Sequence, residues 1–186
     1  MKIAVFCGSS PGNKPYFIEA AEHFGQTMTR LGHDLVFGGG NVGLMGCVAD
    51  AVLASGGKAY GVIPESLRDR ELAHQGLTRL DVVKSMHERK ARMADLADAF
   101  VALPGGPGTM DEIFEAWTWG QLGYHHKPCA LYNVNGYYDE LLSLIGKMFS
   151  SGFLKQEYAD MVIVEQEPEA LIARLENYQP PIQKWH

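Results

Sequence analysis

The sequence has few cysteines, no long apolar run and no secretory leader pattern. Cys7, Cys47 and Cys129 lie far apart and form no C-x-x-C pair, so neither a disulfide framework nor a zinc-binding pattern is indicated. No apolar run approaches the roughly 20 residues that cross a bilayer. The chain opens directly into an apolar segment after Lys2, without a basic region and cleavage site. We therefore expect a cytoplasmic protein with reduced thiols and no membrane partner.

Basic residues are also scarce. Lys and Arg number 16 against 22 Asp and Glu, which gives a net charge of −6. A general nucleic-acid binder carries a basic face, so we expect no nucleic-acid partner, although a local loop field can still attract a small anion. The seven histidines form no H-x-x-x-H or H-E-x-x-H pair, and we expect no metal site.

The length and composition indicate one globular domain. A chain of 186 residues, 46% of them hydrophobic, is long enough to bury roughly 70% of its unfolded surface. No repeat, linker or low-complexity block interrupts it. We expect a single nucleotide-binding α/β domain over residues 1–186, with a core over residues 1–178 and a C-terminal tail over residues 179–186.

Short apolar runs alternate with amphipathic segments along the whole chain. Runs of this kind, separated by helices, predict a mostly parallel, doubly wound sheet with helices on both faces. The expected strands cover residues 2–7, 34–37, 59–63, 78–83, 99–103, 129–132 and 161–164. Expected helices cover residues 15–31, 44–54, 85–96, 110–122, 137–149 and 168–177, with Leu31 and Phe149 on inward faces, and residues 64–76 form a loop or short helix.

Three glycine-bearing loops follow expected strands, at Gly8, Gly38 and Gly105. In doubly wound sheets ligands bind at the carboxyl ends of the strands, where the strand order reverses. The three loops can therefore line one crevice.

Residues 104–112, Pro-Gly-Gly-Pro-Gly-Thr-Met-Asp-Glu, are the most informative stretch. Three glycines allow close backbone approach to a ligand, and a following helix aims free N–H groups at the loop. This predicts an anion-binding loop with Glu112 about one turn into the helix. The alternative is purely structural: Thr109 caps the helix, and Glu112 is its partner in a T-x-x-E capping box.

Residues 38–43 match G-x-G-x-x-G between a strand and a helix. That is the dinucleotide fingerprint, but it belongs in the first strand–helix unit of a dinucleotide fold, and here it falls in the second. The acid expected about 20 residues later could only be Glu65, which lies beyond Pro64. A structural glycine turn and a phosphate loop of another kind remain open.

Residues 85–90, Ser-Met-His-Glu-Arg-Lys, form a capping box followed by two cations in the first turns of a helix. The helix dipole disfavours cations there, and such a break of a local rule is typical of a functional site. Arg89 could clamp a phosphate or hold Glu112 in place. A solvated basic turn that pairs with Glu88 or Asp95 is the alternative. Trp117, Trp119 and Tyr124 could stack a base or simply belong to a core helix face.

With these motifs in hand, the chain resembles the LOG (Lonely Guy) family of cytokinin riboside 5′-monophosphate phosphoribohydrolases. The family motifs M-H-x-R-K and P-G-G-x-G-T-x-x-E are both complete, at residues 86–90 and 104–112, and their separation matches. Residues 38–46 are similar to the family's upstream glycine segment. The resemblance extends over about residues 2–175. Pro107 occupies the variable position of the second motif, and Asp111 stands where many relatives have Glu.

The resemblance implies a Rossmann-like homodimer with sites near the subunit interface. It implies hydrolysis of the N-glycosidic bond of a nucleoside 5′-monophosphate, AMP or an N6-isoprenoid cytokinin ribotide, to free base and ribose 5-phosphate, with Arg89 and Glu112 as the catalytic pair and no cofactor. Many relatives are labelled lysine decarboxylases, but no lysine here has a motif that supports a pyridoxal Schiff base. The expected substrate contacts are Glu71, Lys90, Gly106, Pro107, Gly108, Thr109, Met110, Asp111 and Thr118, with Gly39, Gly40, Asn41 and Met86 added from the upstream glycine segment and the first motif. Two alternatives stay open: a non-catalytic nucleotide-binding or sensing module, and an NAD-dependent enzyme.

Overall fold

The computed structural model describes residues 1–68 and 73–181. The strands are β1 (Lys2–Phe6), β2 (Asp34–Phe37), β3 (Ala59–Pro64), β4 (Arg79–Val83), β5 (Ala99–Ala102), β6 (Cys129–Tyr132) and β7 (Val162–Glu165). The helices are α1 (Pro15–Arg30), α2 (Gly43–Ala54), α3 (Glu65–Arg68), α4 (Met86–Leu96), α5 (Pro107–Gln121), α6 (Asp139–Ser150), α7 (Gln156–Ala159) and α8 (Pro168–Glu176), with a short 3₁₀ turn, η1 (Val134–Gly136). In the described residues the seven expected strands are all present.

All seven strands pair in parallel in one sheet of order β4-β3-β2-β1-β5-β6-β7. The doubly wound prediction is confirmed. The chain adds strands outward from β1 to β4, then returns to the other side of β1 and continues outward from β5 to β7. The strand order therefore reverses between β1 and β5, and the carboxyl ends of these two strands are the expected ligand-binding position.

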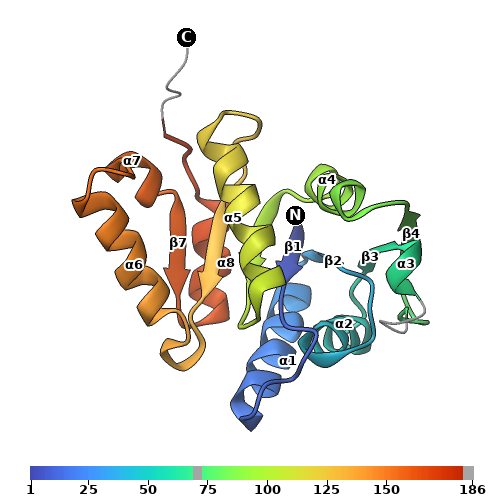
Figure 1. Cartoon of the computed structure of the whole chain (residues 1–186). Coiled ribbons are helices and arrows are strands. Elements are labelled where there is room, and N and C mark those ends of the chain that lie inside the picture. Colours follow the sequence, from blue (N-terminus) through green and yellow to red (C-terminus); the bar gives the residue numbers. More distant parts are fainter. Residues whose placement is uncertain (69–72, 182–186) are drawn as a thin grey trace.

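Alternate residues of each strand enter two separate cores, because successive side chains point to opposite faces of a sheet. In β1, Ile3 and Val5 pack with α1, α2 and α8, whereas Ala4 and Phe6 pack with α4, α5 and α6. Figure 1 shows α3 beside β3 and β4 at one edge, and α6 and α7 beyond β7 at the other. The helices that carry the two family motifs, α4 and α5, thus cover the same face of the sheet.

Two inward positions predicted from helical periodicity are wrong. Leu31 is 41% exposed and Phe149 is 45% exposed. Leu31 is the residue after the last helical turn of α1, and Gly32 follows with a φ of 81° that helical residues do not adopt. The helical face therefore no longer dictates where Leu31 points. Phe149 lies in the last turn of α6, next to the exposed Ser150.

The capping box of α4 is confirmed in one half and modified in the other. Ser85 Oγ accepts a hydrogen bond from the Glu88 amide at 3.2 Å. The Glu88 carboxylate accepts from the amide of Lys84 at 2.8 Å, one residue before the amide that a capping box uses. Both bonds still satisfy backbone donors at or just before the start of α4. They thereby set the start of the helix from which the side chains of Arg89 and Lys90 project.

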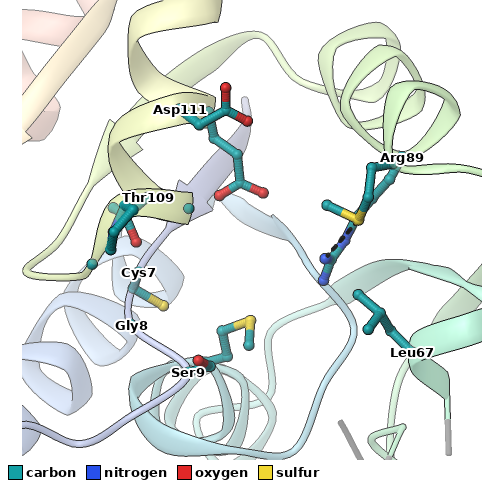
Figure 2. Close-up of a pocket in the computed structure, with 13 residues that line it drawn as sticks. Cys7, Gly8, Ser9, Leu67, Arg89, Thr109 and Asp111 are labelled. Atoms are coloured by element: carbon teal, nitrogen blue, oxygen red, sulfur yellow. Dashed lines mark hydrogen bonds between the residues drawn. The ribbon is translucent and has the colours of Figure 1, made fainter. Parts of the chain in front are cut away.

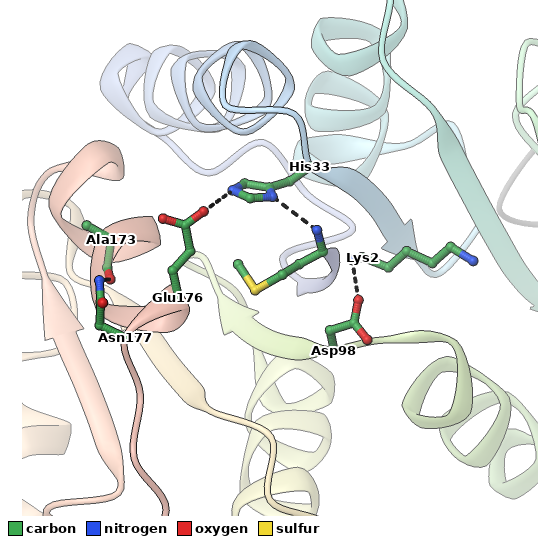
Figure 3. A network of polar contacts seen from close by, with 7 residues as sticks. Lys2, His33, Asp98, Ala173, Glu176 and Asn177 are labelled. Carbon is green, nitrogen blue, oxygen red and sulfur yellow. Dashed lines mark hydrogen bonds and ion pairs between the residues drawn. The ribbon is translucent and has the colours of Figure 1, made fainter.

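At the amino ends of the strands, a polar network ties the chain start to β2 and α8 (Figure 3). The His33 ring is 6% exposed; its Nδ1 lies 3.2 Å from the Met1 amino group, and its Nε2 lies 3.2 Å from a carboxylate oxygen of Glu176. The Lys2 amide donates to Asp98 at 2.7 Å. Burial, followed by the charge of the terminal amine, lowers the pKa of His33, although Glu176 acts in the opposite direction.

None of the described helices combines the length and apolar character needed to cross a bilayer.

The lowered pKa of His33 predicts that folding stability falls in mild acid. The unfolded chain, with a histidine pKa of about 6.5, binds this proton more readily than the folded chain, so stability is lost as the pH falls below that value. Urea unfolding between pH 7.5 and 5.5 should show a smaller loss in His33→Gln than in the parent protein. His23→Gln, which removes a half-exposed histidine of α1, should keep the parental loss; equal slopes in all three proteins would contradict the prediction.

Candidate active site

Backbone hydrogen bonds join the glycine loops at the point where the strand order reverses. The Gly8 amide, just after β1, donates to the Pro104 carbonyl after β5 at 3.0 Å, and the Gly8 carbonyl accepts from the Leu44 amide of α2 at 3.0 Å. Gly43 has a φ of 53°, and a Cβ there would lie 2.3 Å from the carbonyl carbon of Ser9. Any side chain at residue 43 would therefore separate the first two loops.

A pocket of about 280 Å³ opens at this edge of the sheet. Figure 2 shows Thr109 and Asp111 of α5 on one wall, Arg89 of α4 on the facing wall and Leu67 beside it. The lining residues are Cys7, Gly8, Ser9, Met45, Leu67, Met86, Arg89, Gly106, Pro107, Gly108, Thr109, Asp111 and Glu112. Both predicted catalytic residues and six of the predicted substrate contacts, Met86 and five residues at the start of α5, thus lie around one cavity.

Helix α5 begins three residues earlier than predicted. Gly106 is its N-cap and Pro107 its first residue, a position where proline's fixed φ suits a helix and its missing N–H is not needed. Thr109 lies inside the first turn and is 4% exposed. The alternative in which Thr109 caps the helix and Glu112 completes a capping box is therefore wrong. The N–H groups at the start of α5 lack intrahelical acceptors and can bind an anion.

The glycines of this loop differ in what surrounds them. A Cβ at Gly105 would lie 2.1 Å from Thr109 Oγ1 and 2.9 Å from the Gly8 amide nitrogen. A Cβ at Gly106 or Gly108 would meet nothing within 4 Å. Internal packing thus requires glycine at residue 105, whereas glycine at residues 106 and 108 leaves open space beside the pocket.

Arg89 is 5% exposed and is held by backbone carbonyls of two strand ends. Its Nε donates to the Val62 carbonyl at 3.0 Å and its Nη2 to the Gly38 carbonyl at 2.6 Å. Its Nη1 lies 3.9 Å from the sulfur of Met86. A Cβ at Gly38 would lie 2.3 Å from Nη2, so glycine at residue 38 makes room for the guanidinium.

Glu112 lies on the same wall as the start of α5 and is half-buried. Burial, followed by the negative charges of Glu112 and Cys47, raises the pKa of the Cys7 thiol. Cys7 therefore stays protonated and is a poor nucleophile. Among the described lining residues, the ionisable side chains are Cys7, Arg89, Asp111 and Glu112, of which Arg89 supplies the positive charge.

Lys90 does not line this pocket. Its ammonium group lies 3.1 Å from Asp111 and 3.1 Å from Glu115, so it joins α4 to α5. Burial acts to lower the pKa of Lys90, but the hydrogen bonds to Asp111 and Glu115 outweigh it and raise the pKa. Lys90 also borders, with Glu112 and Glu115, a second cavity of about 10 Å³, the size of about one water molecule.

Several other predicted contacts lie away from the pocket in the isolated chain. The Gly39 carbonyl accepts from the His74 amide at 3.0 Å, and Gly40 pairs with Ala73 in an isolated bridge. Asn41 is exposed. Met110 packs into the core under α5, and Thr118 is exposed on that helix. Glu71 lies outside the described residues.

Five lining residues were absent from the expected catalytic and substrate contacts, although the Gly8 loop was expected to line the same crevice: Cys7, Gly8, Ser9, Met45 and Leu67. The Gly-Ser-Ser loop after β1 carried a signal, because it follows a strand that neighbours the switch point. The side chains of Cys7, Met45 and Leu67 belong to ordinary apolar segments, and no pattern distinguishes them. Among residues 1–68 and 73–181, no group of three His, Cys, Asp or Glu side chains is arranged to hold a metal ion.

Comparisons with known structures agree with the fold. A molybdenum cofactor carrier protein from Chlamydomonas reinhardtii has a TM-score of 0.71 at 20% sequence identity, with 95% of this chain and 96% of that chain covered. A molybdenum cofactor binding protein from Rippkaea orientalis has the same TM-score and identity, with 95% of each chain covered. At this identity the likeness concerns the fold alone.

Sequence comparisons are more specific. The family described as "Possible lysine decarboxylase" matches residues 45–175. The cytokinin riboside 5′-monophosphate phosphoribohydrolase LOG7 of Arabidopsis thaliana is 46% identical over 179 residues, covering 96% of this chain and 82% of the relative. The phosphoribohydrolase LOG of Oryza sativa subsp. japonica is 45% identical over 179 residues, covering 96% and 74%. With both motifs complete and this identity over nearly its whole length, the chain belongs to the LOG family.

Proposed function

We propose that this protein hydrolyses the N-glycosidic bond of nucleoside 5′-monophosphates, AMP or N6-isoprenoid cytokinin ribotides, to free base and ribose 5-phosphate. The observation that carries the proposal is one pocket, at the switch point of the sheet, that combines an open helix start with Arg89 and Glu112. The names of relatives about 45% identical state the same reaction class. Residues 1–178 act in this proposal as one nucleotide-binding domain, and its setting is the cytoplasm, where the free thiols of Cys7, Cys47 and Cys129 stay reduced.

The substrate phosphate binds at the start of α5 in this proposal. The amides of Gly106, Gly108 and Thr109 offer donors, and the positive end of the helix dipole attracts the anion. Gly106 and Gly108 leave the space that phosphate oxygens need, because no internal atom occupies it. A phosphate anchored there fixes the ribose over the pocket and lowers the entropic cost of the reaction.

Glu112 acts on the ribose in the bond-breaking step. As the C1′–N bond breaks, its electron pair leaves with the base and positive charge develops on the ribose. The Glu112 carboxylate stabilises that charge and accepts a proton from the attacking water, whose oxygen forms the new bond to C1′. The departing base takes up one proton, so the sum is hydrolysis without a cofactor.

Arg89 supplies a preorganised positive charge. The Val62 and Gly38 carbonyls orient the guanidinium before substrate arrives, so little reorganisation is needed when an anionic substrate enters. Asp111 and Glu112 make the pocket otherwise acidic, and Arg89 offsets part of that charge for a phosphate dianion. Lys90, through Asp111 and Glu115, holds α4 against α5 and keeps Arg89 and Glu112 at a constant separation.

The dinucleotide alternative receives no support from the arrangement of residues 38–43. The carbonyl of Gly38 accepts from Arg89, Gly39 pairs with His74, and Gly40 pairs with Ala73. None of these three glycines lines the pocket. A non-catalytic nucleotide-binding module would share every feature described so far, so turnover decides between it and the enzyme.

Replacing Glu112 by Gln tests the catalytic role. Purified parent protein should release adenine from AMP or the free base from isopentenyladenosine monophosphate, and Glu112→Gln should lower kcat by roughly 10²-fold or more while nucleotide binding persists. Chromatographic product analysis across a panel of nucleoside monophosphates measures this. Glu140→Gln, on the exposed surface of α6, is the matched control and should keep parental activity. Folded parent protein that cleaves neither nucleotide would refute the proposal.

Two glycine substitutions should separate binding from stability. Gly108→Ala adds a methyl group that meets no internal atom and should stabilise the helix by up to about 0.5–1 kcal/mol, yet it should raise the KM for AMP because it occupies the ligand's space. Gly105→Ala should instead destabilise the fold by about 1–3 kcal/mol, because its methyl group collides with Thr109. Thermal unfolding and AMP titrations on both variants measure the difference. Unchanged KM in Gly108→Ala would place the phosphate elsewhere.

We also propose a homodimer that uses the exposed side of α5. Thr118, a substrate contact in the family, is exposed and lies outside the pocket of its own chain. Leu122, the C-cap residue just after α5, lies four residues beyond Thr118 on the same side and is 50% exposed; Tyr124 follows at 75%. A second chain packed on this side would cover these apolar groups and could receive Thr118 near its own pocket.

Light scattering during gel filtration should give twice the 20.5 kDa mass of one chain. Leu122→Asp should shift the protein to the monomer and lower activity with it, because a charge in an apolar interface is costly. Leu144→Asp changes an equally exposed leucine, 49%, on α6 and should leave the dimer intact. A monomeric parent protein with full activity would exclude this interface.

A further inference from the structure

Three consecutive carbonyl groups of the loop after β5 each accept a hydrogen bond from a different donor. The Leu103 carbonyl accepts from the Tyr138 hydroxyl at 2.6 Å, the Pro104 carbonyl from the Gly8 amide at 3.0 Å, and the Gly105 carbonyl from the Tyr137 hydroxyl at 2.6 Å. The orientation of three successive peptide planes is therefore set from outside the loop. Tyr137 and Tyr138 belong to neither family motif.

The two tyrosines come from the turn after β6, which neighbours β5 in the sheet. Figure 1 shows this turn at the same end of the strands as the start of α5. Asn133, 3% exposed, accepts from the Tyr138 amide at 2.7 Å and donates to Asp139 at 2.8 Å. Asn135 adopts a φ of 49°, which is uncommon for a residue other than glycine. The turn is thus held in one conformation by its own hydrogen bonds.

The Tyr137 ring is fixed by aromatic packing, while much of the residue stays exposed. Its ring centroid lies 5.7 Å from that of Phe17 and 5.0 Å from that of Tyr138, both in edge-on contact. Tyr137 is nevertheless 43% exposed. The ring contacts position the hydroxyl, and the exposed setting means that the hydroxyl adds little to folding stability.

The hydroxyl of Tyr137 also affects the N–H group of Gly106, because the Gly105 carbonyl that it binds belongs to the same peptide. In a trans peptide the C=O and the next N–H point in opposite directions, and no cis bond occurs in the described chain. Since the Gly105 carbonyl faces Tyr137, the Gly106 N–H faces away from the turn after β6. Gly106 lines the pocket, and Tyr137 does not.

We propose that Tyr137 is a positioning residue for the anion-binding loop, and that its hydroxyl holds the Gly105–Gly106 peptide so that the Gly106 N–H donates to the substrate phosphate. This inference rests on the proposed function, because it assumes that the phosphate binds at the start of α5. It adds a residue from the turn after β6 to a site otherwise lined by the loop after β1, by α2, α3 and α4, and by the start of α5.

Tyr138 offers an internal comparison. Its hydroxyl holds the peptide between Leu103 and Pro104, and proline has no N–H to offer a ligand. Tyr138 is also 1% exposed, so loss of its hydroxyl would leave a buried carbonyl without that donor. Two adjacent tyrosines thus make similar hydrogen bonds with different consequences, stability for Tyr138 and ligand binding for Tyr137.

The test is calorimetric titration with ribose 5-phosphate, a phosphate-bearing product of the proposed reaction. Tyr137→Phe should weaken its Kd about threefold to tenfold, the loss expected for one neutral hydrogen bond. The KM for AMP should rise by the same factor, with kcat and the Tm close to parental values. Tyr16→Phe removes a hydroxyl from the same aromatic cluster, where Tyr16 packs on Phe17 at 4.6 Å, and should change none of these. Tyr138→Phe should lower the Tm and leave the Kd within about twofold.

Parental Kd in Tyr137→Phe would overturn the inference, and so would equal weakening in Tyr137→Phe and Tyr138→Phe, which would indicate a generally loosened loop. The proposed reaction can fail separately. If the parent protein binds ribose 5-phosphate with the expected dependence on Tyr137 but does not cleave AMP, the positioning role stands and the hydrolase proposal falls.

Discussion

The backbone of Gly8 is the contact on which the candidate active site depends. Its amide donates to the Pro104 carbonyl and its carbonyl accepts from the Leu44 amide, so one residue joins the loops after β1 and β5 to the start of α2. Parallel strands place these loops at one edge of the sheet, but the strand ladder stops before them. The two hydrogen bonds of Gly8 fix the loops relative to one another beyond the ends of the strands. A site that positions several donors around a ligand needs loops fixed in this way.

The positive groups of the candidate site contrast with the negative net charge of the whole chain. The chain carries a net charge of −6, and Asp111 and Glu112 both line the pocket. The anionic substrate of the proposed function would therefore be attracted by local groups: the start of α5, with its dipole and free amides, and the guanidinium of Arg89. Two carbonyls hold Arg89 in place, and the fixed φ of Pro107 restricts the backbone at the start of α5. Fixed dipoles act more strongly than mobile ones because they need no reorganisation.

Most of the fold could be predicted from the sequence because its signals are local. Short buried runs alternating with amphipathic segments specify a parallel sheet, and glycines mark the loops at its edge. The start of α5 was mistaken because Pro107 and Thr109 are both good starting residues, and only the close packing of Thr109 on Gly105 decides between them. The sequence also did not indicate that Lys90 lies outside the pocket, for a different reason. Its long side chain reaches carboxylates of α5, and which helices pack together depends on tertiary contacts.

The difference between local sequence signals and tertiary contacts also explains why the two motifs are short although the pocket has many lining residues. In the proposed reaction Arg89 and Glu112 act directly on the substrate. The guanidinium of Arg89 is oriented by groups that any residue can supply, the carbonyls of Val62 and Gly38. Contacts made by backbone groups cannot be recognised in a sequence, except where a side chain would obstruct them and glycine is required. Gly38, Gly43 and Gly105 are such positions, since a Cβ at each would lie within 2.3 Å of another atom. In these loops, a glycine in the sequence therefore marks a position where the backbone closely approaches another group of the site.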